Sequence, residues 1–144
     1  MTIHLREVIE VGPPIEEVFA FVADFANAQR WDPTVQRSER VGGPDGVGAS
    51  YALTIRFHGR DLLMTYTVVG SEPPRRVVLA GTSSTVNALD DISLEVTASG
   101  GTRVIYRADL SMRHVLRVLE PRLRARFEEM GRNALAGMQA ALDG

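Results

Sequence analysis

The longest regular pattern of apolar and polar residues lies at the C-terminal end of the chain, between Met112 and Asp143. Apolar residues recur there at steps of three or four, so they share one face of a helix. The members of this stripe are Leu116, Leu119, Leu123, Phe127, Met130, Ala134, Met138 and Ala141. Pro121 interrupts the pattern and leaves two alternatives: a short turn over residues 115–120 followed by a helix from Pro121, or one helix kinked at Pro121. In either form the stripe needs a broad apolar partner.

The preceding chain alternates apolar and polar residues with the period of two that is typical of strands. The first such segment covers residues 3–11, with Glu7 as the exception in its alternation. Further strands are predicted over residues 34–41, 51–57, 62–68, 77–80, 85–98 and 102–112. Clusters of glycine, proline and polar residues separate these segments and predict turns between them.

Two short helices are predicted between the first and second strands. Pro14 and the acidic residues after it favour a helix over residues 15–24, because proline fits the first helical turn and acidic side chains suit its positive end. Residues 25–31 predict a second short helix. Asp32-Pro33 ends it, since a residue that precedes proline is disfavoured in the helical conformation.

The order of elements is therefore one strand, two short helices, about six hairpin-connected strands and a long helix. Strands that follow one another through tight turns form an antiparallel sheet. Each strand has one apolar face, and only the C-terminal helix is long enough to cover that face. We predict a single α+β domain over residues 1–144, a size that can bury a substantial core. Any function is expected in the space between the curved sheet and the helix.

Composition narrows the possible chemistry. The net charge of −2 gives no basic field for nucleic acid or for an anionic membrane. The chain has no cysteine, which excludes disulfides, thiolate catalysis and cysteine-ligated metal centres. All 16 basic residues are arginines, so a Schiff-base lysine and a P-loop lysine are excluded as well.

The sequence carries no targeting or membrane-spanning pattern. Its N-terminal residues lack the charged region and apolar run of a secretory signal, and no window approaches eighteen apolar residues. We therefore expect a cytoplasmic protein without integral membrane association. The exclusive use of arginine, with abundant alanine, glycine and valine, is typical of a GC-rich bacterial genome.

Three polar residues on the predicted inner face are candidates for catalysis. Asp90 shares the parity of Ile92 and Leu94, so an unbroken strand turns its carboxyl group into the apolar interior. There its pKa would rise and it could act as a general acid or base. If residues 87–91 form a loop or bulge instead, Asp90 lies in water. Tyr66 and Tyr106 can donate hydrogen bonds to a bound carbonyl or enolate, or to groups of the protein itself.

The same parity predicts the wall of a ligand-binding cavity, although many of these residues would serve equally as core. The predicted wall consists of Trp31, Tyr51, Leu53, Ile55, Phe57, Met64, Tyr66, Leu94, Tyr106, Leu123, Phe127, Met130 and Gly131. Gly131 either leaves room for a ligand or lets the helix pack closely on the sheet. The three histidines lack the spacing of metal ligands, so we predict no metal site and no cofactor.

Specific motifs resemble a known superfamily over essentially the whole chain. The opening reads IEVGPP at residues 9–14, IEEVF at 15–19 and FVAD at 21–24, followed by Trp31, and GGTRV at 100–104 precedes the last strand. These motifs resemble the START/birch-pollen-allergen superfamily (SRPBCC), and within it the bacterial polyketide cyclase/dehydrase-like proteins. The resemblance implies a helix-grip fold, a seven-stranded antiparallel sheet wrapped around a long helix with an apolar cavity between them.

Members of that superfamily bind lipids, sterols, hormones, polyketide intermediates or isoprenoid quinones, and they share no universal catalytic motif. The first hypothesis is therefore a binder of a hydrophobic or aromatic, lipid- or polyketide-like small molecule. The alternative is a polyketide cyclase- or dehydratase-type enzyme that uses Asp90, Tyr66 and Tyr106. A second alternative is a protein-interaction module. The expected partner is a hydrophobic small molecule rather than nucleic acid, and the chain is expected to be a monomer or a homodimer.

Overall fold

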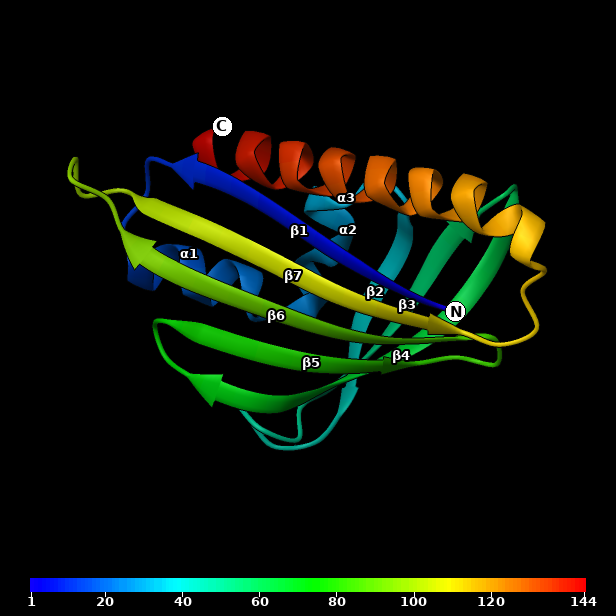
Figure 1. Cartoon of the computed structure of the whole chain (residues 1–144). Coiled ribbons are helices and arrows are strands. Elements are labelled where there is room, and N and C mark those ends of the chain that lie inside the picture. Colours follow the sequence, from blue (N-terminus) through cyan, green and yellow to red (C-terminus); the bar gives the residue numbers. More distant parts are fainter.

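Seven antiparallel strands form one curved sheet in the computed structural model, which describes all 144 residues (Figure 1). The strand order is β1-β7-β6-β5-β4-β3-β2, so every strand from β2 to β7 lies beside its neighbours in the sequence, and β1 pairs with β7. The strands are β1 (Thr2–Val11), β2 (Val35–Gly42), β3 (Ser50–Phe57), β4 (Arg60–Glu72), β5 (Arg76–Thr82), β6 (Val86–Val96) and β7 (Thr102–Met112). The predicted seven-stranded antiparallel sheet is confirmed.

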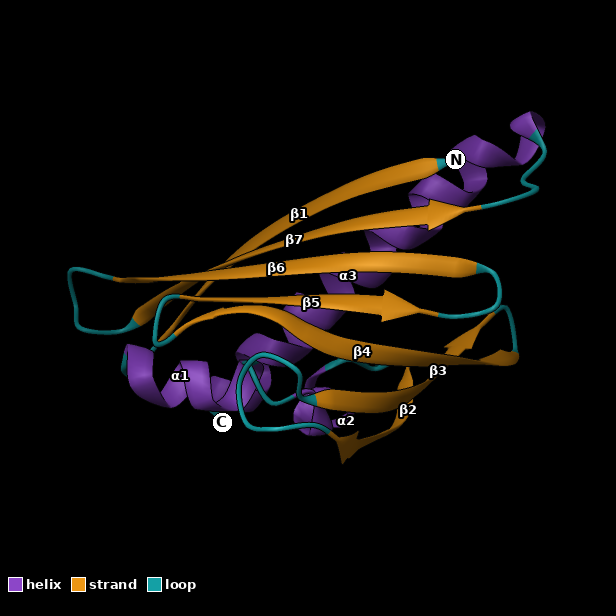
Figure 2. Ribbon diagram, turned by 90° about the horizontal axis from the view of Figure 1, so that it is seen from below, coloured by secondary structure: helices purple, strands orange, loops and turns teal.

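The helices that cover this sheet lie against its concave face (Figures 1 and 2). They are α1 (Ile15–Val22), the 3-10 turn η1 (Phe25–Asn27), α2 (Ala28–Trp31) and α3 (Glu120–Asp143), whereas the 3-10 turn η2 (Arg117–Leu119) lies beyond the ends of β1 and β7. The long α3 crosses the strands obliquely in Figure 2. Pro121 stands in the first turn of α3, where its missing N–H costs nothing. The first of the two alternatives for this segment is therefore correct, and the fold class is confirmed as helix-grip.

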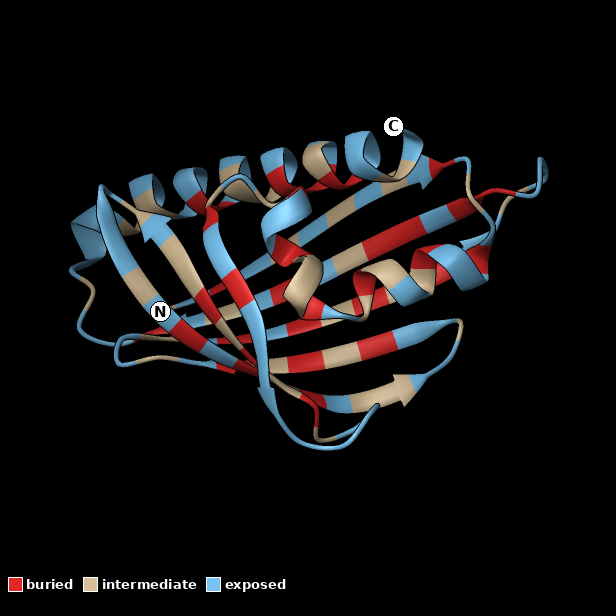
Figure 3. Cartoon of the chain, turned by 180° about the vertical axis from the view of Figure 1, so that it is seen from behind, coloured by how far each residue is buried: buried red, intermediate tan, exposed pale blue.

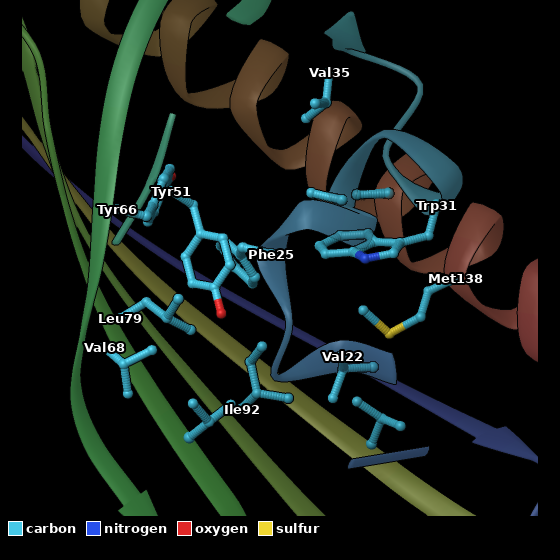
Figure 4. Close-up of a cluster of buried hydrophobic side chains, with 14 of the residues drawn as sticks. Val22, Phe25, Trp31, Val35, Tyr51, Tyr66, Val68, Leu79, Ile92 and Met138 are labelled. Carbon is cyan, nitrogen blue, oxygen red and sulfur yellow. The ribbon is translucent and has the colours of Figure 1, made fainter. Parts of the chain in front are cut away.

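Buried and exposed side chains alternate along the strands, as the period of two requires (Figure 3). The buried side chains of the main core gather where α1, η1 and α2 cover one end of the sheet (Figure 4). Phe25 and Trp31 supply the aromatic rings of this end, with ring centroids 6.0 Å apart. Met138 of α3 is fully buried among them. This end of the sheet is therefore filled by the protein itself.

The C-terminal half of α3 packs closely against this filled end. A Cβ atom on Gly137 would lie 2.1 Å from the carbonyl oxygen of Trp31, so only glycine permits the observed approach of α3 to α2. Farther along, the backbone N–H of Gly12 donates a hydrogen bond to Asp143 Oδ1 at 2.7 Å. The side chain of Gln139 donates another to the carbonyl of Glu10 at 2.9 Å. A cavity remains under the middle of α3.

No helix in the structure combines the length and the apolar character that crossing a membrane would need.

Candidate ligand-binding site

A cavity of about 140 Å³ lies between the sheet and the middle of α3. Fifteen of its 20 lining residues are hydrophobic. Phe57 at the end of β3 and Phe127 of α3 close one end, with stacked rings whose centroids are 4.9 Å apart. Trp31, at the end of α2, lines the cavity on the side of the filled core. The space is thus an apolar chamber, which is the usual form of a small-molecule site.

Most of the predicted wall residues do line this cavity. The residues that the structure brings together there are Trp31, Ile55, Phe57, Met64, Tyr66, Tyr106, Phe127, Met130 and Gly131, with the predicted acid Asp90. At Gly131, an added Cβ would meet its nearest neighbours, atoms of Leu5 and Glu7, only at 3.8 and 3.9 Å. Close packing therefore does not require glycine at this position, and the glycine contributes open space to the wall.

Four predicted wall residues lie elsewhere. Tyr51, Leu53 and Leu94 are buried in the core that α1 and η1 cover, where the Tyr51 ring packs against Phe25 with centroids 6.4 Å apart. Leu123 packs in a second, small cluster of apolar side chains, which also contains Phe57 and Phe127. Residue parity identifies the inner face of a strand correctly. It cannot tell which part of that face is covered by the short helices and which part borders the cavity.

Asp90 faces the cavity because β6 is regular along its whole length. The register from Val86 opposite Met112 to Val96 opposite Thr102 has no bulge, so the alternative of a loop over residues 87–91 is excluded. The side chain is 6% exposed. Tyr106 on β7, whose ring centroid is 6.0 Å from that of Trp31, donates its hydroxyl hydrogen to Asp90 Oδ2.

The second carboxyl oxygen, Asp90 Oδ1, is buried and has no hydrogen-bond partner. Burial raises the pKa of Asp90 from 3.8 to about 7, and the bond from Tyr106 partly opposes this rise. At neutral pH the group is therefore close to half protonated, so Oδ1 can accept or donate a hydrogen bond. Burial, together with the charge of Asp90, raises the pKa of Tyr106 well above its ordinary value.

Tyr66 reaches the cavity across a glycine. Tyr66 on β4 lies opposite Gly81 on β5, and a Cβ atom on Gly81 would fall 2.6 Å from Cε1 of the tyrosine ring. The missing side chain at Gly81 leaves room for the ring over β5. The only hydrogen-bond acceptor near its hydroxyl is Met64 Sδ, at 4.0 Å. Burial, and then the charges of Asp90 and Asp32, raise the pKa of Tyr66 well above its ordinary value.

The sequence reading missed three polar residues of the cavity wall: Glu7, Asp32 and Thr34. Asp32 Oδ1 accepts hydrogen bonds from the backbone N–H of Thr34 at 2.9 Å and from its hydroxyl at 2.8 Å. Burial nevertheless raises the pKa of Asp32, and its charge contributes to the raised pKa of Asp90. The sequence predicts Asp32 only as the residue that ends a helix before proline. Glu7 was visible as the break in the first strand's alternation.

A further buried polar atom, Trp31 Nε1, also has no hydrogen-bond partner. In Figure 4 the indole nitrogen is on the edge of the ring that faces Met138, in the filled core. It therefore offers nothing to a molecule in the cavity. The polar side chains of the cavity wall are therefore Glu7, Asp32, Thr34, Asp90, Tyr66 and Tyr106. No group of three or more histidine, aspartate or glutamate residues is arranged to hold a metal ion.

The fold and the site define the chain as a START-like helix-grip protein. Its sequence matches, over residues 2–143, the family described as polyketide cyclase/dehydrase and lipid transport. The chain belongs to this family, and the resemblance seen in the sequence is confirmed. The family and the fold together indicate a ligand-binding or polyketide cyclase-like function. No curated protein matches the sequence.

Solved structures share the fold at low sequence identity. A START superfamily protein from Mycobacterium smegmatis has a TM-score of 0.76 at 14% identity, with 96% of this chain and 98% of that chain covered. The ZhuI aromatase/cyclase from Streptomyces sp. R1128 has a TM-score of 0.78 at 14% identity, with coverages of 99% and 92%. A protein from Thermus thermophilus has a TM-score of 0.79 at 14% identity, with 96% of both chains covered. Such similarity establishes the fold alone.

Proposed function

We propose that the protein binds a small hydrophobic or aromatic molecule that carries a hydroxyl or carbonyl group. One observation carries this proposal: Asp90 Oδ1 is buried without a partner in the wall of an otherwise apolar cavity. The lipid transport named in the family description supports a hydrophobic ligand. A lipid- or polyketide-like compound fits both the apolar wall and the polar group.

The unpaired carboxyl oxygen has a free-energy cost that a ligand would remove. A buried polar atom without a hydrogen bond destabilises a protein by roughly 1–3 kcal/mol. A ligand hydroxyl can donate to the ionised form of Asp90, and the protonated form can donate to a ligand carbonyl. Both forms are available at neutral pH because the pKa of Asp90 is about 7. Tyr66 lies in the same wall and offers a hydroxyl without an oxygen or nitrogen partner.

The size of the cavity sets the size of the ligand. Its volume of about 140 Å³ is close to that of an engineered apolar cavity of about 150 Å³ that binds benzene. One aromatic ring or a short branched chain fits within this volume. The cavity is partly open, so a larger ligand could place one ring inside it, beside the stacked Phe57 and Phe127, and extend outside.

Two probes of equal size test the polar contact. Phenol and toluene differ by a hydroxyl in place of a methyl group, so calorimetric titration with each isolates the contribution of hydrogen bonding. We expect the wild-type protein to prefer phenol and Asp90→Leu to prefer toluene. Tyr51→Phe is a matched control, because Tyr51 is a buried tyrosine outside the cavity. The same preference in the wild type and in Asp90→Leu, or no binding of either probe, would contradict the proposal.

A second candidate function is proton transfer on a bound carbonyl compound, as in a polyketide cyclase or dehydratase. The observation that favours it is the hydrogen-bonded pair of Asp90 and Tyr106, in which the carboxyl group has a pKa near the working pH of a general acid or base. In this reading the Tyr66 hydroxyl, which has no oxygen or nitrogen partner, polarises the carbonyl oxygen, while the hydroxyl of Tyr106 holds the Asp90 carboxyl group in place. Asp90 removes a proton from the neighbouring carbon and returns it elsewhere.

Hydrogen exchange on a one-ring ketone tests this second function without knowledge of the natural substrate. Cyclohexanone is incubated in heavy water, and NMR follows the replacement of hydrogen at the carbons beside the carbonyl. Catalysis by the wild type that Asp90→Asn abolishes would support the enzyme. Equal exchange rates for the two proteins would remove Asp90 from the mechanism.

A further inference from the structure

Positive charge is concentrated in one short segment of this acidic protein. Residues 113–126 contain five arginines and one glutamate, a net charge of +4 within a chain of net charge −2. The remaining 130 residues therefore carry a net charge of −6. We call residues 113–126 the basic tip. It comprises the loop after β7, the turn η2 and the first turns of α3.

The arginines of the basic tip are exposed, and none of them takes part in an ion pair. They are Arg113, Arg117, Arg122, Arg124 and Arg126. Elsewhere on the surface, Arg40, Arg76 and other arginines have carboxylate partners. Among these arginines, Arg126 lies near an aromatic ring: its guanidinium is 5.9 Å from the ring centroid of Phe57. The tip thus presents positive charge that the protein itself does not neutralise.

Large apolar side chains are exposed between these arginines. Leu116 is 67% and Val118 79% exposed, and Leu119 is also exposed. Two neighbouring apolar residues point the other way: Val115 and Leu123 pack on a small core cluster beneath the tip. The segment is therefore held on the protein by one set of apolar side chains, while a second set extends into solvent.

The basic tip projects from the end of the molecule. Figures 1 and 2 show the loop after β7 and the first turn of α3 extending beyond the ends of β1 and β7, beside the N-terminus. The cluster beneath the tip includes Phe57 and Phe127, the stacked pair that closes the cavity. The tip and the closed end of the cavity are therefore neighbours.

We propose that the basic tip docks the protein on the surface of an anionic lipid bilayer. Arginines attract acidic lipid headgroups, and the exposed Leu116 and Val118 can enter the boundary between headgroups and acyl chains. Nucleic acid would satisfy the charges but not the aliphatic side chains, and the tip has no phenylalanine, tyrosine or tryptophan on which bases could stack. Docking in this way is peripheral and requires no spanning helix.

If the protein binds a hydrophobic ligand as proposed above, the position of the tip affects how that ligand reaches the cavity. A protein docked through residues 113–126 holds the Phe57–Phe127 end of its cavity close to the bilayer. A hydrophobic ligand could then pass between the acyl chains and the cavity with little exposure to water. Docking itself needs no ligand, so vesicle binding and ligand binding can fail independently.

Vesicle sedimentation at low salt tests the docking surface in the full-length protein. Vesicles of phosphatidylglycerol and phosphatidylcholine in equal parts are compared with vesicles of phosphatidylcholine alone. We expect binding to the anionic vesicles only. Arg117→Gln with Arg122→Gln should weaken it about 25-fold, since each arginine near an anionic surface contributes about fivefold, or about 1 kcal/mol. Leu116→Ser with Val118→Ser should weaken it at least roughly tenfold.

Matched control variants change the same residue types on the outer face of the sheet. Arg6→Gln with Arg107→Gln removes two exposed arginines, and Leu63→Ser with Val69→Ser removes two exposed aliphatic side chains. These controls should bind as the wild type does. Failure to bind anionic vesicles, equal binding to neutral vesicles, or equal losses in control and tip variants would overturn the proposal. So would a serine variant that binds normally, because charge alone would then account for the attraction.

Discussion

The buried carboxyl group of Asp90 should make the stability of the protein depend on pH in an unusual direction. Most acidic residues stabilise a fold when they are ionised, because salt bridges or hydrogen bonds hold their pKa down. Asp90 is the opposite case, since burial raises its pKa in the folded state to about 7. Replacing it by asparagine removes the titration and keeps a side chain of the same shape that can still accept the hydrogen bond from Tyr106.

The magnitude follows from the two pKa values. The unfolded chain exposes Asp90 at its ordinary pKa of 3.8, whereas the folded chain holds it at about 7. Between these pH values the folded protein binds one proton more than the unfolded chain, so its free energy of unfolding falls as the pH rises. The interval spans roughly three pH units at about 1.4 kcal/mol each. Full ionisation of Asp90 therefore lowers the free energy of unfolding by about 4 kcal/mol. This loss is complete once the pH is well above 7.

Urea unfolding of the wild type and Asp90→Asn measures this effect. The stability of the variant relative to the wild type should increase by about 4 kcal/mol between pH 4 and pH 8. Any constant cost of the amide cancels in this comparison, and so does the titration of Asp32, which both proteins retain. A stability difference that does not change with pH would refute the reasoning.

Asp91→Asn provides a control from the next position of β6. Asp91 lies on the outer face, where Arg76 donates two hydrogen bonds to its carboxylate, at 3.0 and 2.6 Å. Loss of this partly exposed pair should destabilise the protein at neutral pH by up to about 1 kcal/mol. Asp91→Asn is thus expected to lose stability at neutral pH, whereas Asp90→Asn, at the adjacent position, should gain stability relative to the wild type as the pH rises.

Three further substitutions test the packing of α3 and the electrostatics of the site. Gly137→Ala should cost at least roughly 1–3 kcal/mol in urea unfolding, because its Cβ would meet the Trp31 carbonyl oxygen at 2.1 Å. Gly131→Ala has no atom nearer than 3.8 Å and should be nearly neutral, so equal costs would contradict this packing. Tyr106→Phe removes the hydrogen bond that lowers the pKa of Asp90. An NMR titration of the Asp90 carboxyl carbon should then give a pKa above that of the wild type, and a lower value would contradict the assigned bond.

Much of the fold could be predicted because periodicity records which side of an element is buried. The alternation along β6 placed Asp90 on the inner face, and the regular register with β7 explains why this succeeded. The same rule placed Tyr51 and Leu94 in the cavity wall, where the structure does not have them. Their position depends on how far α1 and η1 extend over the sheet. That is a property of the assembled fold, which the pattern of one strand does not contain.

Loop residues and local charge escaped the sequence reading for different reasons. Asp32 reaches the cavity from the end of α2, and a turn has no periodicity that reveals the direction of a side chain. The net charge of the whole chain does not reveal the basic tip, because −2 is the sum of +4 in residues 113–126 and −6 in the remaining residues. A charge count in short windows would have found it. The exposure of Leu116 required the structure, since its spacing fits the buried stripe of the helix.

The acidic residues that line the cavity stand where the neighbouring sequence is mostly apolar. Glu7 breaks the alternation of β1, Asp90 occupies an apolar position of β6, and Asp32 stands at the end of α2. These three acids come from separate parts of the chain, yet all of them line the same chamber. The raised pKa of Asp90 and of Asp32 indicates that burying these two carboxyl groups is unfavourable for folding. Local rules of folding are broken together mainly where function requires it. Their convergence argues for a site that recognises polar groups on a hydrophobic ligand, rather than for an incompletely filled core.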